Sequence, residues 1–382
     1  MRLLNTGSYE LTEFYGDKIP PYAILSHTWG DEEVLFADIQ NNTAQSKRGF
    51  RKLMGCCQNA IKNGFKWVWV DTCCIDKSSS AELSEAINSM YQWYRDSTIC
   101  YAYLEDVTDV LCTPGTSSKR FTESRWFTRG WTLQELIAPR VVEFYTQAWE
   151  EIGTKMSLDE EIAATTGIPA SILRGKDVST RNVAERMSWA SKRQTTRRED
   201  MAYCLMGLFQ INMPLLYGEG DKAFVRLQEQ ILRQEEDYSI LAWTPQENYG
   251  PLVSMGCLAS SPCQFTTVVP ERLPSSAGWA AEISYMNSEL PSYGNTELFP
   301  STGEYRTMKT KSYKRFRKAE LGQNIRMPKD PPQLTARGLR ISLPVRCTDI
   351  PGESESKRLL SAWLAWIYYE VDDRLDTIAV AD

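Results

Sequence analysis

The sequence of 382 residues contains a single histidine, His27, and this scarcity limits the chemistry open to the chain. Its ten cysteines include no pair in Cys-x-x-Cys spacing. Structural zinc sites use closely spaced cysteine and histidine ligands, so no metal site is expected. Several cysteines lie in apolar runs, which favours reduced, buried thiols over a disulfide scaffold.

Long apolar runs are also missing. No run approaches the roughly 20 residues of a membrane-spanning helix, and the N-terminus lacks the apolar core and cleavage site of a secretory signal. We therefore expect a cytoplasmic protein with no membrane span. The formal net charge of −6 and the pI near 5.3 argue against a nucleic-acid partner. A Gly-x-x-x-x-Gly-Lys-Ser/Thr phosphate loop is absent, so P-loop nucleotide binding is not expected.

What is present is an ordinary globular composition, with 42% hydrophobic and 24% charged residues. Apolar runs predict buried strands over residues 22–26, 67–70, 98–104 and 141–145. Apolar residues at helical spacing predict helices over 49–63, 79–94 and 132–138, the second opened by a capping box at Ser79 and Glu82. Strands that alternate with helices predict a parallel α/β sheet.

After residue 150 the sequence pattern changes twice, first to helical periodicity and then to short β-like runs. Further helices are predicted over 157–166, 182–191, 198–209 and 219–235. From Trp243 onward, proline and serine become frequent and short β-like runs occur at 264–269, 339–345 and 359–370, while 291–322 is expected to be a long surface loop. We therefore expect three regions: an α/β core over 1–150, a helical part over 151–242 and a smaller β-rich region over 243–382.

The most unusual segment is 124–136, Ser-Arg-Trp-Phe-Thr-Arg-Gly-Trp-Thr-Leu-Gln-Glu-Leu. Its arginines, tryptophans and internal carboxylate are Arg125, Trp126, Arg129, Trp131 and Glu135. Indole rings stack on aromatic ligands, guanidinium groups bind phosphates, and apolar surroundings disfavour a charged carboxylate. This mixture suits a pocket for an aromatic, phosphate-bearing ligand. The alternative is that the tryptophans belong to the core and the arginines form surface ion pairs.

Polar residues also follow the first three predicted strands, at 26–30, 71–76 and 105–106. Ligands of open α/β sheets bind outside the carboxyl ends of the strands. The helix that carries Glu135 begins after the third strand and its loop, so four segments are expected to converge at one edge of the sheet. This convergence predicts a ligand site there.

Four motifs together resemble the fungal heterokaryon incompatibility (HET) domain over about residues 20–240. They are Ala-Ile-Leu-Ser-His-Thr-Trp-Gly at 23–30, Trp-Val-Trp-Val-Asp-Thr-Cys-Cys-Ile-Asp at 67–76, Arg-Gly-Trp-Thr-Leu-Gln-Glu-Leu at 129–136 and Arg-Glu-Asp-Met-Ala-Tyr-Cys-Leu-Met-Gly at 198–207. The resemblance implies non-self recognition and a regulated cell-death response. Family members often carry a nucleotide-binding oligomerisation module and repeats downstream. Neither is found in this chain, so self-association and a separate sensor protein are the expected partners.

The HET domain in turn looks distantly like the flavodoxin-like TIR fold, whose parallel sheet has the strand order 2-1-3-4-5. Some TIR domains cleave NAD at the nicotinamide–ribose bond through a glutamate in a pattern like Ser-x-Trp-Cys-x-x-Glu-Leu. Residues 124–126 and 131–136 resemble this pattern in two pieces, and the chain has five more residues here than the pattern. The resemblance implies that Glu135 is catalytic, with Glu123 as the alternative position. NAD, or a related nucleotide, is then the substrate and no resident cofactor is expected.

In this role Glu135 would hold the ribose hydroxyls and stabilise the oxocarbenium-like charge that develops as nicotinamide leaves; otherwise it is a surface or capping carboxylate. The remaining NAD contacts are expected from strand-end residues and from the aromatic segment, namely Ser26, His27, Trp29, Gly30, Asp71, Arg125, Trp126, Arg129 and Trp131. Ser26 and Gly30 suit a phosphate and Asp71 suits ribose hydroxyls. A lone histidine is more often structural, and Asp71 can equally cap a helix.

The leading hypothesis is therefore a cytoplasmic cell-death effector that acts as an NAD glycohydrolase (NADase). The first alternative is a non-enzymatic adaptor that signals by self-assembly, with the strand-end surface as its interface. The second is a nucleotide-binding sensor without turnover.

Overall fold

The computed structural model describes residues 1–108, 120–235, 237–243 and 258–265, together with the backbone of four short strands between 333 and 362. The chain divides into two compact units. One comprises Met1–Thr180 and Trp189–Leu227, and the other comprises Arg181–Ser188 and Gln228–Asp382. The first unit contains all the predicted site residues. The predicted three-part division at 150 and 242 stays a prediction.

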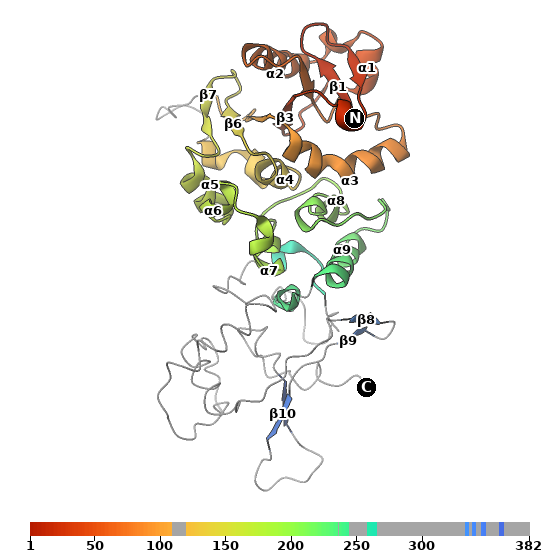
Figure 1. The fold of residues 1–382 in the computed structure, drawn as a ribbon, viewed down its shortest axis with the longest axis vertical. Helices are drawn as coiled ribbons and strands as arrows, with labels where there is room; N and C mark the ends of the chain where they lie inside the picture. The colour runs from red at the N-terminus through yellow and green to blue at the C-terminus, as the bar shows by residue number, and fades with distance from the viewer. Residues whose placement is uncertain are drawn as a thin grey trace. The chain divides into compact units, whose positions relative to one another are not determined.

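The first unit is built on a seven-stranded sheet of order β2-β1-β4-β3-β5-β6-β7 (Figure 1). The strands are β1 (Arg2–Asn5), β2 (Leu11–Glu13), β3 (Ala23–His27), β4 (Trp67–Trp69), β5 (Ile99–Tyr103), β6 (Val142–Tyr145) and β7 (Glu151–Thr154). The central strands β4, β3, β5 and β6 pair in parallel. The outer strands β2, β1 and β7 pair antiparallel.

The predicted α/β class is confirmed, but the prediction of a sheet parallel throughout is wrong at both edges. β1 and β2 form an N-terminal hairpin, and neither strand contains more than two consecutive apolar residues to mark it in the sequence. β7 follows β6 after a short connection, which an antiparallel neighbour permits, whereas a parallel neighbour needs a crossover of a dozen or more residues. The sheet is therefore mixed.

Helices cover both faces of this sheet. Figure 1 shows α1 (Phe36–Gln40) and α2 (Phe50–Lys62) on one side of the strands, and α3 (Ser80–Asp96) and α4 (Thr132–Ile137) on the other. Half of the predicted capping box of α3 is confirmed, because the Ser79 hydroxyl accepts a hydrogen bond from the backbone N–H of Glu82. The Glu82 carboxylate accepts from the backbone N–H of Asp76 instead of that of Ser79. α2 gives way to a turn at Gly64, whose φ of +80° favours glycine.

The predicted helices after residue 150 are present but shorter. The α-helices of this part are α5 (Asp159–Thr166), α6 (Ala170–Leu173), α7 (Val183–Ser188), α8 (Asp200–Tyr203) and α9 (Lys222–Gln234). Short 3-10 helices are η1 (Gly16–Lys18), η2 (Ala44–Ser46), η3 (Phe121–Glu123), η4 (Arg125–Thr128), η5 (Val178–Thr180), η6 (Gly207–Phe209), η7 (Tyr238–Leu241) and η8 (Pro262–Phe265). The single helix predicted over 198–209 is thus divided between α8 and η6.

In the second unit the described strands are β8 (Gln333–Thr335), β9 (Gly338–Arg340), β10 (Val345–Thr348) and β11 (Leu359–Ala362), paired as two antiparallel hairpins. β9 and β10 overlap the β-like run predicted at 339–345 and β11 overlaps the one at 359–370, whereas β8 was not predicted. The run predicted at 264–269 is wrong where it is described, because η8 includes its first two residues. The surface loop predicted over 291–322 lies outside the described residues.

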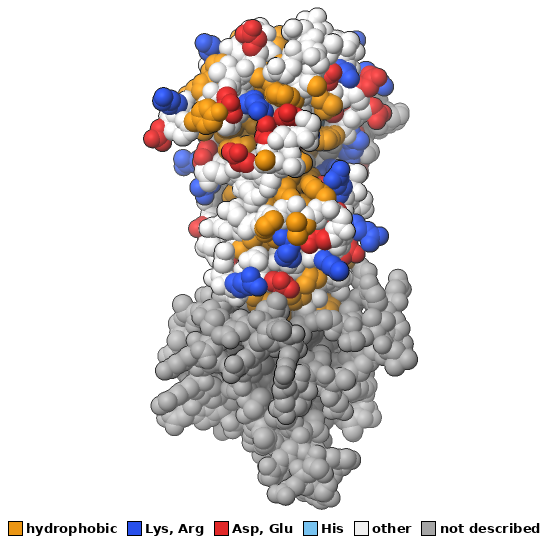
Figure 2. All heavy atoms as spheres, turned by 90° about the vertical axis from the view of Figure 1, so that its right-hand side faces the viewer, with side chains coloured by type: hydrophobic (Ala, Val, Ile, Leu, Met, Phe, Trp, Pro, Cys, Tyr) orange, Lys and Arg blue, Asp and Glu red, His pale blue; other side chains and the backbone are white. Residues whose placement is uncertain are grey.

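The core of the first unit is formed by apolar strand residues and by the helix faces above and below them. The cysteines described there are free and buried, as predicted: Cys56, Cys57, Cys73, Cys74, Cys100 and Cys204. On the face seen in Figure 2, acidic and basic side chains are interspersed over the described residues. That face carries no continuous field of one sign that would attract a polyanion.

Candidate functional site

Glu135 lies in α4 and is only 6% exposed. The hydroxyl of Ser26, in β3, donates a hydrogen bond to Oε2 of Glu135. The indole N–H of Trp126, in η4, donates to Oγ of Ser26 over 2.8 Å. Three residues that are far apart in the sequence therefore form one buried chain of hydrogen bonds on the α3–α4 side of the sheet.

This environment keeps Glu135 largely neutral. Burial raises its pKa to about 8, and the negative charge of Asp71 acts in the same direction. Hydrogen bonds with Ser26 and Tyr94 and the positive charge of Arg193 oppose the rise. At neutral pH most of the group is protonated and can donate a proton, whereas its anion predominates only above about pH 8.

Two buried cations lie at the ends of α4. The ammonium of Lys155 donates to the backbone oxygen of Leu136 over 3.1 Å and to that of Pro139. Burial lowers the pKa of Lys155 to about 8. At the other end, the Arg193 guanidinium donates to Oγ1 of Thr132 over 2.9 Å. The short helix that carries Glu135 is thereby held at both ends.

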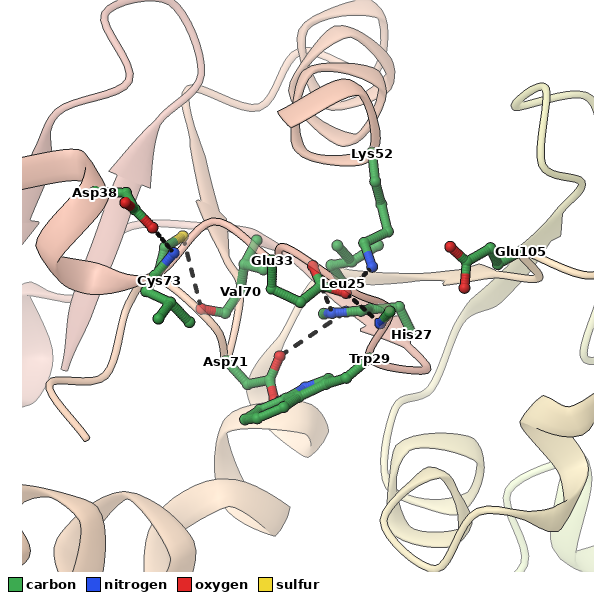
Figure 3. A network of polar contacts seen from close by, with 12 residues as sticks. Leu25, His27, Trp29, Glu33, Asp38, Lys52, Val70, Asp71, Cys73 and Glu105 are labelled. Atoms are coloured by element: carbon green, nitrogen blue, oxygen red, sulfur yellow. Dashed lines mark hydrogen bonds and ion pairs between the residues drawn. The ribbon is translucent and has the colours of Figure 1, made fainter. Parts of the chain in front are cut away.

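His27 lies between two carboxylates on the opposite face of the sheet, because successive strand residues point to opposite faces (Figure 3). Its Nδ1 is 3.9 Å from Oδ1 of Asp71, and its Nε2 is 3.9 Å from Oε2 of Glu33. Neither ring nitrogen has a hydrogen-bond partner among the described residues. Burial lowers the pKa of His27 well below 6.5, and the charges of Lys52 and Lys77 add to this effect. The ring is therefore neutral at physiological pH, and neither contact is an ion pair.

Trp29 lies at the rim of this cluster and is 49% exposed. Its indole N–H donates to Oδ2 of Asp71 over 2.8 Å, as Figure 3 illustrates. The ammonium of Lys77 lies 3.5 Å from the centroid of the Trp29 ring, a cation–π contact. Deeper in the cluster, Glu33 accepts from Nζ of Lys52 over 2.5 Å and from the backbone N–H of Gly30 over 2.7 Å. Of the predicted ligands described here, Trp29 is the one with the largest exposed aromatic surface.

Gly30 and Arg125 meet at Glu105. A Cβ atom at Gly30 would lie 3.1 Å from Oε1 of Glu105, so the glycine admits a close carboxylate. The guanidinium of Arg125 forms an ion pair with the same carboxylate, and both side chains are partly exposed. Arg125 is thus near the strand ends, as predicted, but is already paired with an acidic side chain.

Arg129 and Trp131 are not brought to either cluster by their described contacts. The Arg129 guanidinium donates to Oγ1 of Thr196 over 3.1 Å, and Trp131 is hydrogen-bonded to Asp200. Trp126 is fully buried, as the core alternative expected, although its N–H joins the Glu135 chain. The structure therefore groups Ser26 with Trp126 and Glu135, and His27 with Trp29 and Asp71.

Sequence reasoning missed several partners of these groups, namely Glu33, Lys52, Lys77, Tyr94 and Arg193. Lys77 had a signal, because it directly follows the strand-end motif at 71–76. Lys52 shares the buried face of α2 with Cys56, one helical turn away, and gave no signal that separates it from a solvent-facing lysine. Within the described ranges, no group of three or more His, Cys, Asp or Glu side chains is arranged to hold a metal ion.

Comparison with known proteins gives two matches. The family model of the heterokaryon incompatibility protein (HET) matches residues 22–117, which include 26–30 and Asp71 but not Glu135. The chain is 54% identical over 220 residues to the vegetative incompatibility protein HET-E-1 of Podospora anserina. That match covers 56% of this chain and 16% of the relative, so the chain spans a small part of the relative's length. No solved structure matches the chain. None of the helices in the described part of the chain has the length and apolar character needed to cross a bilayer.

Proposed function

Because the chain carries a heterokaryon incompatibility domain, as its four motifs predicted, we propose that it acts as a cell-death effector in vegetative incompatibility. We further propose that it cleaves NAD at the nicotinamide–ribose bond, with Glu135 as the catalytic carboxylate. The observation that carries this second step is the buried carboxyl group of Glu135, bound to Ser26 at the carboxyl end of a parallel strand.

A TIR-like core is part of the proposal. It is supported by the four central parallel strands, whose order β4-β3-β5-β6 is the second, first, third and fourth of the strands predicted from sequence. Glu135 lies in the helix between β5 and β6. Strand-end residues of β3 and β4 gather at the same edge, where open α/β sheets bind ligands.

In the proposed reaction, the bond between C1′ of the ribose and N1 of nicotinamide breaks, and nicotinamide leaves with the electron pair. Positive charge develops at C1′, and an anionic Glu135 stabilises it. Water then attacks C1′ and loses a proton, which gives ADP-ribose. Because the pKa of Glu135 is raised to about 8, the reaction should accelerate as pH rises toward 8. The exposed ring of Trp29 offers a stacking surface for an NAD base.

The burial of Glu135 also favours a second candidate, the non-enzymatic adaptor. Ser26 and Trp126 are fully buried and Glu135 nearly so, which is the environment of a structural polar network. As an adaptor, the chain would signal by self-assembly and use its strand-end surface as an interface. For the enzymatic proposal, NAD must reach Glu135 through an opening of this network on binding or assembly.

The test is nicotinamide release from NAD by the purified chain, followed from pH 6 to pH 9 at several protein concentrations. Glu135→Gln removes the carboxylate and keeps the side-chain shape. Glu160→Gln is the matched control, because Glu160 is an exposed glutamate at the start of α5. Each variant is also expressed in fungal cells, and cell death is scored.

The enzymatic proposal expects release that depends on Glu135, together with loss of killing in the same variant. Killing that persists in Glu135→Gln, with no release by the parent chain, would instead support the adaptor. Saturable NAD binding without nicotinamide release would identify a nucleotide sensor.

A further inference from the structure

The four residues between Trp126 and Trp131 include two whose backbone groups bind a distant segment of the same unit. The backbone N–H of Gly130 donates to the oxygen of Gln194 over 2.9 Å, and the N–H of Gln194 donates to the oxygen of Thr128 over 2.7 Å. These bonds form an isolated parallel bridge at Gln194. The loop that leads into α4 is therefore held by backbone pairing.

The approach of these two segments requires a glycine. A Cβ atom at Gly130 would lie 2.5 Å from Cγ2 of Thr195 and 3.0 Å from Sγ of Cys204. Since real Cβ contacts are longer, any other residue would force the Thr195 side chain, or the segment that carries it, to shift. The absence of a side chain at Gly130 thus allows residues 194–195 to pack closely against this loop.

Arg193 is the side chain that connects this pairing to both partners of Ser26. Its Nη1 donates to the backbone oxygen of Arg129 over 2.8 Å and to Oγ1 of Thr132 over 2.9 Å. The Thr132 hydroxyl in turn lies 2.5 Å from the backbone oxygen of Trp126. One guanidinium therefore fixes the end of η4, which carries Trp126, and the first residue of α4, which carries Glu135.

Arg193 is also a buried charge that interacts electrostatically with Glu135. It is 5% exposed, and its Nη2 has no hydrogen-bond partner among the described residues. A buried, incompletely paired cation is costly unless a negative charge compensates it. Glu135 is a nearby group that can supply that charge, and its interaction with Arg193 favours the carboxylate form.

We propose that Arg193 is a positioning residue for Glu135: its guanidinium fixes the segment from Trp126 to the start of α4, and its positive charge acts on the Glu135 carboxyl group. The contribution of Arg193 to catalysis rests on the proposed NAD cleavage. The effect of Arg193 on the ionisation of Glu135 is independent of that proposal.

The experiment has two independent readouts on the full chain. The first is the midpoint of Glu135 ionisation, taken from the pH dependence of the difference in unfolding free energy between Glu135 and Glu135→Gln. This difference is measured in the parent and in Arg193→Met, Arg193→Lys and Arg198→Met backgrounds. Arg198 is the matched control, because its side chain is 77% exposed and forms an ion pair with the exposed Asp221. The second readout is the pH profile of nicotinamide release.

Removal of the positive charge in Arg193→Met should raise the midpoint of Glu135 ionisation by about 1 pH unit. Nicotinamide release at pH 7 should then fall about tenfold and recover at higher pH, because less carboxylate is present. A purely structural lesion would lower the whole profile without moving it. Arg193→Lys retains the charge and loses the guanidinium fork, so its midpoint should stay near the parent value while release falls at every pH.

The inference would be overturned if the midpoint of Glu135 ionisation were the same in the Arg193→Met and Arg198→Met backgrounds. If Arg193→Met does not fold, Arg193→Lys decides it: parent-like release at every pH would refute the positioning role. Absence of nicotinamide release by the parent chain would refute the proposed function alone, and the unfolding midpoints would still decide the inference.

Discussion

The neutral state of Glu135 makes a prediction that does not depend on any catalytic activity. We expect Glu135→Gln to stabilise the protein at alkaline pH relative to the parent. Glutamine keeps the size of the side chain and its capacity to accept a hydrogen bond from Ser26, but it never carries the buried negative charge that the parent acquires.

The sign and size follow from the raised pKa of Glu135, which moves from 4.5 to about 8 on folding. Between these values the folded chain holds a proton that the unfolded chain has released, so the parent loses stability as pH rises. The full change corresponds to about 5 kcal/mol as an upper bound. The stability of Glu135→Gln lacks this component, so the stability of the variant relative to the parent should rise from about pH 5 to pH 8 and level off above that.

Urea unfolding monitored by far-UV circular dichroism at pH 5, 7 and 9 measures the difference. Other titrating groups, including Lys155, affect parent and variant alike and cancel to first order. Glu160→Gln should show a difference from the parent that does not vary with pH, because its carboxylate is exposed. A flat difference for Glu135→Gln as well would show that Glu135 is ionised throughout, and the reasoning from its burial would be wrong.

Three further changes test the surroundings by the same urea titration. Ser26→Ala leaves the buried indole N–H of Trp126 without its acceptor, so we expect a loss of about 1–3 kcal/mol; an unchanged midpoint would contradict that bond. Gly130→Ala brings a methyl group within 2.5 Å of Thr195 Cγ2, and overpacking should cost about 1–3 kcal/mol; parent-like stability would mean that the two segments separate freely. Trp29→Phe removes a half-exposed N–H donor and keeps a ring, so the loss should stay below about 1 kcal/mol. A larger loss would make Trp29 a structural residue rather than a ligand-facing one.

The central strands and the helices around them could be predicted because burial on both faces leaves a direct trace in the sequence. The run at 67–70 and the periodic apolar residues of 49–63 correspond to β4 and α2 within one or two residues. The hairpin of β1 and β2 could not be predicted in this way. Its strands are held by pairing with β4 through β1, and pairing partners leave no periodic pattern in a short strand.

The candidate site was predictable at the level of strand ends but not of side-chain partners. Ser26 and Glu135 were both singled out, yet the bond between them spans 109 positions and depends on how α4 packs. Arg193 could not be identified, because an arginine in a polar stretch has the same appearance whether it is solvated or buried. Ser26 and His27 were both assigned to the NAD contacts, yet as neighbours in a strand they point to opposite faces of the sheet and lie in different groups.

The adjacency of Ser26 and His27 determines how different kinds of mutation affect the two groups of residues. Ser26 and His27 share one peptide bond, but one belongs to the compartment of Glu135 and the other to the compartment of Asp71 and Glu33. A deletion or insertion of a single residue early in β3 would turn each of its side chains to the opposite face of the sheet, so that both groups would receive the wrong side chain. Point substitutions can therefore alter either compartment separately, whereas any change in the length of this strand alters both at once.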